Sequence, residues 1–166
     1  DAIIFNGDSS ALAQGLLGPE TINSTPPVSQ TQRSLSAITW TLSTRTTGFP
    51  LVRHNVFFSS NYKSEFDAIA NARMIDDPTI YVCAQDRGDD DAQINAPERL
   101  LALINAPAIG DARELNPQEI AACTTKAMAR LARCGLQMEQ APSLAQTTNP
   151  NGFNALFPGT GGALYG

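Results

Sequence analysis

The side chains of this sequence that could do chemistry are few and far apart. His54 is the only histidine, and no carboxylate stands at a spacing that would pair with it for acid–base work. Cys83, Cys123 and Cys134 form no CxxC pair and have no histidine cluster beside them. We therefore expect reduced thiols and no metal site, and the sequence leaves the catalytic residues unknown because GxSxG and HExxH motifs are both absent.

Two roles are open for His54. By the alternation of side chains along a strand, it shares one face with Val52, Val56 and Phe58. A lone histidine on such a face is usually a satisfied sheet or core residue. The alternative is a polar group that lines an apolar cavity and hydrogen-bonds a hydroxyl of a bound molecule.

An acidic run occupies residues 86–91. It is predicted to be a solvated hairpin loop, because Gly88 falls where a calcium-binding EF-hand loop needs its second ligand and no glutamate closes the loop. Arg87 lies inside the run and has two candidate roles, one half of an ion pair that locks subdomains together or a site residue.

Glycines are concentrated at Gly159, Gly161 and Gly162. No strand-to-helix context and no Lys-Ser/Thr accompany them, so they make a poor phosphate loop. Two explanations for these glycines stay open. They could allow the backbone to approach a ligand closely, or they could belong to a flexible chain end.

Strands are expected to position these residues. Alternating residues predict a strand over residues 34–46 with Ile38, Trp40 and Leu42 on its covered face. A strand over residues 51–58 is apolar on both faces, which predicts a central place in a mixed sheet. Apolar runs closed by turn residues predict further strands over residues 2–5, 79–85 and 100–105.

Helices are predicted between and after the strands. The clearest begins at Asn116, a capping residue followed by Pro117 and by Glu119, and it stops at Gly135. A second helix follows a cap in residues 59–61, with Phe66, Ile69, Ala70 and Arg73 on one stripe. Shorter helices are expected after Asp8 or Ser9 and over residues 151–156, with residues 136–148 extended between the last two. The predicted class is α+β, a mixed, largely antiparallel sheet flanked by helices.

Composition limits the functions that are open. Hydrophobic residues make up 42% of the 166 residues and charged residues only 16%, which suggests that part of the surface is covered by a partner or by further chain. The net charge of −5 and the lack of a Lys/Arg cluster argue against nucleic acid and against a polybasic membrane anchor. No apolar run is long enough for a spanning helix and no leader precedes the first strand, so we expect neither, in a chain cut from a longer polypeptide.

Four strings of residues resemble one enzyme family. They are HNVFFSSNYKSEFDAI (54–69), DPTIYVCAQDR (77–87), DAIIFNGDSSALAQGLLG (1–18) and NGFNALFPGTGGALYG (151–166). Together they resemble the flavin-dependent, phytoene dehydrogenase-like carotenoid desaturases, most closely the 1-hydroxycarotenoid 3,4-desaturase (methoxyneurosporene dehydrogenase) branch. The resemblance runs over nearly the whole chain.

The resemblance implies a domain plan. Residues 1–20 would be a remnant strand and helix of the FAD-binding domain, and residues 21–33 a connector. Residues 34–148 would form the substrate domain of an amine-oxidase-like flavoprotein. Residues 149–166 would be a glycine-rich segment that leads toward a C-terminal FAD motif outside this chain.

The resemblance also implies a function. The parent would remove hydrogen from the C-3/C-4 bond of an acyclic hydroxy- or methoxy-carotenoid, with FAD as hydride acceptor. Because GxGxxG is absent, this segment alone is expected to bind no FAD and to be inactive. The residues expected to contact substrate are Trp40, His54, Val56, Phe58 and Tyr81, and those expected near the cofactor are Gly159, Gly161 and Gly162.

Two alternatives remain beside this function. One is a retinol-saturase-like oxidoreductase of the same architecture, and the other is a non-enzymatic isoprenoid- or retinoid-binding module. The expected location is cytoplasmic with peripheral contact at the inner membrane, because the implied substrate lives in lipid, although no segment forms a strong interfacial helix.

Overall fold

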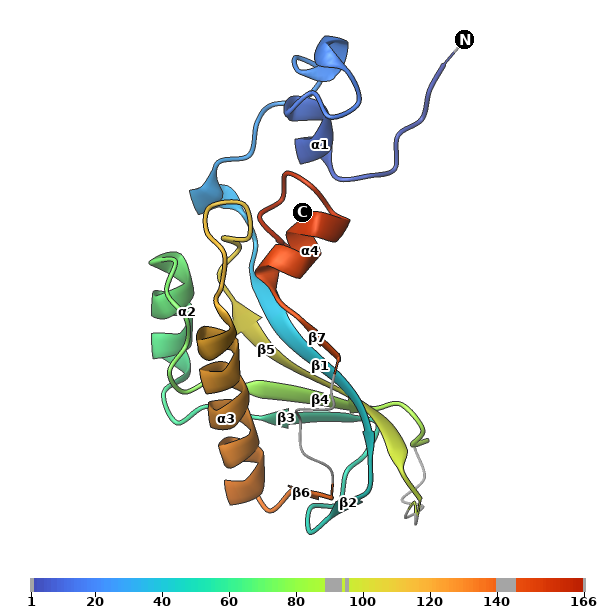
Figure 1. The fold of residues 1–166 in the computed structure, drawn as a ribbon, viewed down its shortest axis with the longest axis vertical. Helices are drawn as coiled ribbons and strands as arrows, with labels where there is room; N and C mark the ends of the chain where they lie inside the picture. The colour runs from blue at the N-terminus through green and yellow to red at the C-terminus, as the bar shows by residue number, and fades with distance from the viewer. Residues whose placement is uncertain (1, 89–93, 95, 140–145, 166) are drawn as a thin grey trace.

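A five-stranded antiparallel sheet organises the fold (Figure 1). The computed structural model describes residues 2–88, 94, 96–139 and 146–165. The strand order is β3-β4-β5-β1-β7, and a second, two-stranded sheet pairs β2 with β6. The strands are β1 (Ser36–Thr44), β2 (Thr46–Thr47), β3 (His54–Phe57), β4 (Ile80–Ala84), β5 (Glu98–Ala106), β6 (Gln137–Met138) and β7 (Gln146–Thr148).

Helices lie beside the sheet, which confirms the predicted α+β class. Figure 1 shows α3 beside the sheet and α4 next to the end of β7. Every strand pairing in the described residues is antiparallel. The helices are α1 (Ser9–Ala13), α2 (Tyr62–Ala70), α3 (Pro117–Arg133) and α4 (Pro150–Leu156), with short 3-10 turns at Pro19–Thr21 and Gln30–Gln32.

The core lies between one face of the sheet and α3. Trp40 and Ile38 on β1 are fully buried, as the alternation in this stretch predicts. Cys123, Ala127 and Leu131 of α3 belong to the same buried hydrophobic cluster as Ile38 and Trp40. Burial of such side chains is the main stabilising contribution to a sheet–helix pair of this kind.

The capping signals of α3 are confirmed. Asn116 Oδ1 accepts from the Glu119 backbone N–H at 2.9 Å, and Glu119 Oε2 accepts from the Asn116 N–H at 3.0 Å. Gly135 follows the helix with φ +93°, a conformation that favours glycine. Local residues alone determine where this helix begins and ends.

The predicted strand over residues 2–5 is wrong. These residues form no strand, and the side chains of Ile3 and Ile4 are 96% and 95% exposed. An apolar run becomes a strand only where another strand accepts its backbone hydrogen bonds. Asp8 does cap α1 as predicted, because its carboxylate accepts from the Ser10 N–H at 2.8 Å.

The predicted central place of residues 51–58 is also wrong. Their strand, β3, is only four residues long and lies at the edge of the sheet, whereas β4 and β5 lie inside it. Val52, Val56 and Phe58 are about half exposed or more, so the apolar residues on this face do not indicate burial on both sides.

The predicted stripe of the helix near residue 66 is wrong as well. In α2 the inward residues are Glu65 and Ala68, and Phe66 is 40% exposed. Glu65 is fully buried because its carboxylate accepts from the Thr79 N–H at 3.0 Å and from Asn105 Nδ2 at 2.8 Å. Residues 89–91 of the predicted loop and residues 140–145 of the predicted extended stretch lie outside the described residues.

Candidate functional site

The face of the sheet away from α3 is the candidate site. Strand register aligns its side chains in two rows that cross all five strands. We call this set the open face. One row is Val56, Tyr81, Leu103, Thr39 and Thr148, and the other is His54, Cys83, Leu101, Thr41 and Gln146.

The open face is less covered than the core face. Val56 is 50% exposed, and Tyr81, Cys83, Leu101 and Leu103 are half-buried. None of the ten side chains in the two rows is charged. Half of these side chains are polar, and the other half, which lie on β3, β4 and β5, are apolar or aromatic and suit an apolar partner.

His54 and Tyr81 form a polar pair at the β3–β4 edge of the open face. They are diagonal neighbours on β3 and β4. His54 Nδ1 and the Tyr81 hydroxyl oxygen are hydrogen-bonded at 2.7 Å. Burial raises the pKa of the Tyr81 hydroxyl above its ordinary value, and the hydrogen bond and charge of neighbouring Cys83 raise it further. Tyr81 therefore keeps its proton at neutral pH.

The structure brings three of the five expected substrate-contact residues together. His54, Val56 and Tyr81 share the open face, and Phe58 lies just beyond β3 with 64% of its surface exposed. Trp40 is separated from them, because it is fully buried on the core face and its indole N–H donates to Thr124 Oγ1 at 3.0 Å.

Other open-face residues were missed by sequence reasoning. The most apolar of them come from the inner strands β4 and β5, whose alternation is visible in the sequence. The register that places them beside His54 is not visible there. These missed residues are Thr39, Thr41, Cys83, Leu101, Leu103, Gln146 and Thr148.

The three C-terminal glycines pack against this chain itself. Gly159, Gly161 and Gly162 have φ values of +89°, +65° and +84°. A Cβ on Gly161 would lie 2.5 Å from the Ala108 carbonyl oxygen, and one on Gly162 would lie 2.4 Å from the Pro150 carbonyl oxygen. Close backbone approach is thus required here by intramolecular packing.

Arg33 ties the connector to this glycine segment. Its guanidinium donates to Asp111 Oδ1 at 2.7 Å and Oδ2 at 2.6 Å, and also to the Gly159 carbonyl at 3.3 Å. The hydrogen bond from Arg33 holds the pKa of Asp111 below its ordinary value. The pair fixes the backbone of residues 159–161 beside the end of β5.

Arg87 forms an ion pair with Glu98, as the ion-pair alternative for this arginine predicts, and both residues lie within residues 34–148. Its Nη1 also donates to the Leu51 carbonyl at 2.7 Å. The pair therefore joins β5 to the segment that leads into β3.

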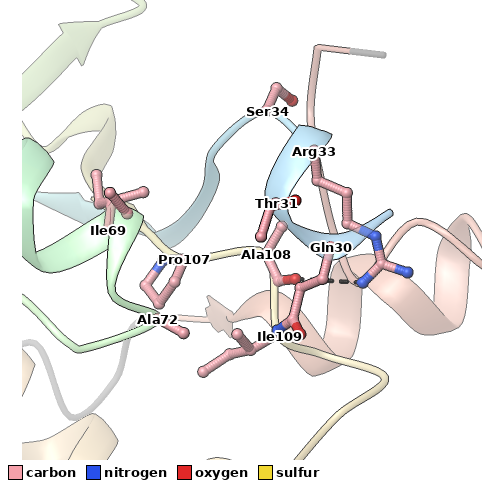
Figure 2. Close-up of a pocket in the computed structure, with 10 residues that line it drawn as sticks. Gln30, Thr31, Arg33, Ser34, Ile69, Ala72, Pro107, Ala108 and Ile109 are labelled. Atoms are coloured by element: carbon pink, nitrogen blue, oxygen red, sulfur yellow. Dashed lines mark hydrogen bonds between the residues drawn. The ribbon is translucent and has the colours of Figure 1, made fainter. Parts of the chain in front are cut away.

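Two pockets lie away from the open face. The first, of about 170 Å³, lies where Ile69 and Ala72 face Pro107 and Ile109 (Figure 2). The second, of about 260 Å³, lies between residues 6–8 and the C-terminal segment at Phe157, Thr160, Ala163 and Leu164. Both are smaller than typical small-molecule sites, which measure roughly 300–1,000 Å³.

Neither a metal-binding cluster nor a membrane-spanning helix is present in the described ranges. No group of three or more His, Cys, Asp or Glu residues there could hold a metal ion. None of the helices in that part of the chain combines the length and the hydropathy that crossing a bilayer requires.

Comparison with known proteins reveals relatives along the whole chain. It is 50% identical over 167 residues to the hydroxyneurosporene desaturase of Rubrivivax gelatinosus, covering 100% of this chain and 32% of that protein. It is 39% identical over 166 residues to the hydroxyneurosporene desaturase of Cereibacter sphaeroides, covering 100% and 33%. A 1-hydroxycarotenoid 3,4-desaturase of Flavobacterium sp. is 27% identical over 137 residues, covering 81% and 28%.

These matches show that the chain is homologous to carotenoid desaturases, which confirms the resemblance seen in the sequence. Within that class, the hydroxyneurosporene desaturases match it from end to end. The chain spans about a third of the length of these relatives. No protein-family model matches it.

Proposed function

We propose that this chain is the substrate-binding portion of a flavin-dependent oxidoreductase that desaturates an acyclic hydroxy- or methoxy-carotenoid at C-3/C-4. The observation that carries the proposal is the 50% identity, over the whole chain, to a hydroxyneurosporene desaturase. The open face supports it, since nine of its ten side chains are exposed or half-buried and only Thr39 is buried, whereas the opposite face of the sheet forms the core.

The open face would hold the polyene across the strands. Val56, Leu101 and Leu103 offer apolar contact, and each Å² of apolar surface removed from water contributes about 25 cal/mol. Five strands spaced about 4.8 Å apart give a face roughly 19 Å wide. The bound polyene and the rest of the parent protein would together exclude water from this face.

The cofactor proposed for the parent is FAD, which supplies the hydride acceptor. The residues of this chain do not fit it by themselves. GxGxxG is absent, and the backbone around Gly161 is already occupied by Arg33, Ala108 and Asp111. We place the flavin on the part of the parent outside this segment, with residues 2–20 and 149–165 as the portion nearest to it.

Within the same proposal the parent contacts the inner membrane peripherally from the cytoplasm, because an acyclic carotenoid is dissolved in lipid. Co-sedimentation of the parent with carotenoid-loaded vesicles tests this part. Recovery of all the protein in the supernatant would contradict it.

A chimera tests the activity. The 167 aligned residues of the Rubrivivax gelatinosus desaturase are replaced by this chain, and conversion of hydroxyneurosporene is followed by polyene absorbance. We expect conversion, because half of the aligned residues are identical and the sheet register depends on this segment alone.

Flavin absorbance and the melting temperature of the chimera report whether it is assembled. A chimera that is folded and loaded with flavin but leaves hydroxyneurosporene unchanged would contradict the proposal. Activity of that chimera on a retinoid but not on the carotenoid would favour the retinol-saturase-like alternative.

A further inference from the structure

We propose that His54 and Tyr81 together recognise the hydroxyl group of the substrate and so select hydroxylated polyenes over the plain hydrocarbon. This inference rests on the proposed function and assigns a specificity-determining role within the open face. It depends on the 2.7 Å contact between His54 Nδ1 and the Tyr81 hydroxyl.

Hydrogen-bond chemistry makes the pair complementary to a hydroxyl. If Tyr81 donates to Nδ1, then His54 Nε2–H remains as a donor and the Tyr81 oxygen as an acceptor. If Nδ1–H donates to Tyr81, the Tyr81 O–H remains as a donor and Nε2 as an acceptor. In either tautomer the pair offers one donor and one acceptor, which is what an alcohol needs.

The surroundings make this complementarity selective. Val56 lies directly opposite Tyr81, Cys83 directly opposite His54, and Leu101 and Leu103 come next in the two rows. A hydrocarbon laid on these side chains would cover the pair and leave its outward donor and acceptor without partners, which is unfavourable. A methyl ether would satisfy only the donor.

The pair would also set the register of the substrate. The name of the Flavobacterium relative, a 1-hydroxycarotenoid 3,4-desaturase, places the hydroxyl on C-1 and the new double bond between C-3 and C-4. An anchor on the C-1 oxygen therefore fixes an atom two carbons from the reacting bond. His54 and Tyr81 act here as positioning residues.

Equilibrium binding to the full-length parent tests the inference. The probes are 1-hydroxyneurosporene and neurosporene, and the change in polyene absorbance measures each dissociation constant. We expect Tyr81→Phe to weaken binding of the hydroxylated probe about tenfold, the effect of one lost hydrogen bond, and to leave the hydrocarbon unchanged. We expect His54→Leu to act in the same direction.

Tyr62→Phe is the matched control, because it removes a phenol hydroxyl from a residue of α2 that is 51% exposed and lies outside the open face. It should change neither dissociation constant. Equal weakening of both probes by Tyr81→Phe, or no change in either, would overturn the inference while the proposed function stands. If the unmodified parent binds neither polyene, the proposed function fails and this inference fails with it.

In turnover, KM for the hydroxylated substrate should rise about tenfold in Tyr81→Phe, since one hydrogen bond in the bound state is lost. The melting temperature of each variant separates this effect from loss of folding. His54→Gln keeps one donor and one acceptor in the side chain, so it should retain more of the preference than His54→Leu.

Discussion

Arg87 holds the carboxylate of Glu98 at two points inside the protein. Nε donates to Oε2 and Nη2 to Oε1, both at 2.7 Å, and the side chains are only 11% and 1% exposed. Burial raises the pKa of Glu98, but hydrogen bonds from Arg87 and Thr46 outweigh it and bring that pKa below its ordinary value. The ionised pair is therefore a structural link between β5 and its neighbours.

Arg87→Ala should destabilise the chain strongly. It leaves the Glu98 carboxylate buried without its cation, which typically costs about 3–5 kcal/mol in the free energy of unfolding. Urea unfolding followed by circular dichroism measures the change. Arg99→Ala is the control, because its partner Asp86 lies in an exposed pair, and this variant should change the midpoint far less.

Stability should fall in acid through Asp77. Its pKa is lowered from 3.8 to about 2, chiefly by a hydrogen bond from the Ser60 hydroxyl and next by one from Arg130. Since the pKa is depressed by folding, Asp77 stabilises the protein at pH values above 3.8, and the contribution is lost as pH falls toward 2. Unfolding free energies of the wild type and Asp77→Asn should therefore converge over that interval.

Ser60→Ala offers the matching check on the cause. It removes the hydroxyl that donates to Asp77 Oδ2 at 2.5 Å. Its pH dependence should lie between those of the wild type and Asp77→Asn. Parallel curves for the wild type and Asp77→Asn from pH 7 to 2 would contradict the assignment.

Thr124→Val should loosen the core around Trp40. The indole N–H loses its acceptor in a buried site, which costs about 1–3 kcal/mol. The emission of this only tryptophan, together with urea unfolding, reports the change. Thr125→Val is a close control. The Thr124 hydroxyl donates to the Ile120 carbonyl at 2.8 Å and the Thr125 hydroxyl donates to the Ala121 carbonyl at 2.9 Å, but Thr125 is exposed and does not contact Trp40 through a hydrogen bond.

Gly161→Ala should be more harmful than Gly135→Ala. Both glycines have positive φ, so each alanine is strained by about 1–3 kcal/mol. Only at Gly161 would the new Cβ also lie within 3 Å of backbone and side-chain atoms, whereas nothing lies within 4 Å of it at Gly135. Equal losses in melting temperature would show that close packing around Gly161 is not important.

Much of the fold could be predicted from the sequence where the signals are local. The start and end of α3 follow from Asn116, Glu119 and Gly135, which act within a few residues of themselves. The alternation in β1 likewise identified its buried side. The order of the strands depends on distant residues, and for that reason β3 was misplaced at the centre of the sheet.

The candidate site was only partly predictable. His54 and Tyr81 were both expected to contact substrate, but their direct pairing depends on the β3–β4 register. Trp40 could not be assigned a side relative to His54, because the sequence shows alternation within a strand and not between strands. A buried acid such as Glu65 is equally hidden, since its partners, Thr79 and Asn105, come from two other segments.

The position of β5 has a consequence for how the chain folds. β1 pairs with β5 from Ser36↔Ala106 to Thr44↔Glu98, so the paired residues are 54 to 70 positions apart in the sequence. β4 also pairs with β5, on its other edge. Contacts between such distant segments make folding slow. During synthesis, the two halves of the sheet can join only after residue 106 has left the ribosome.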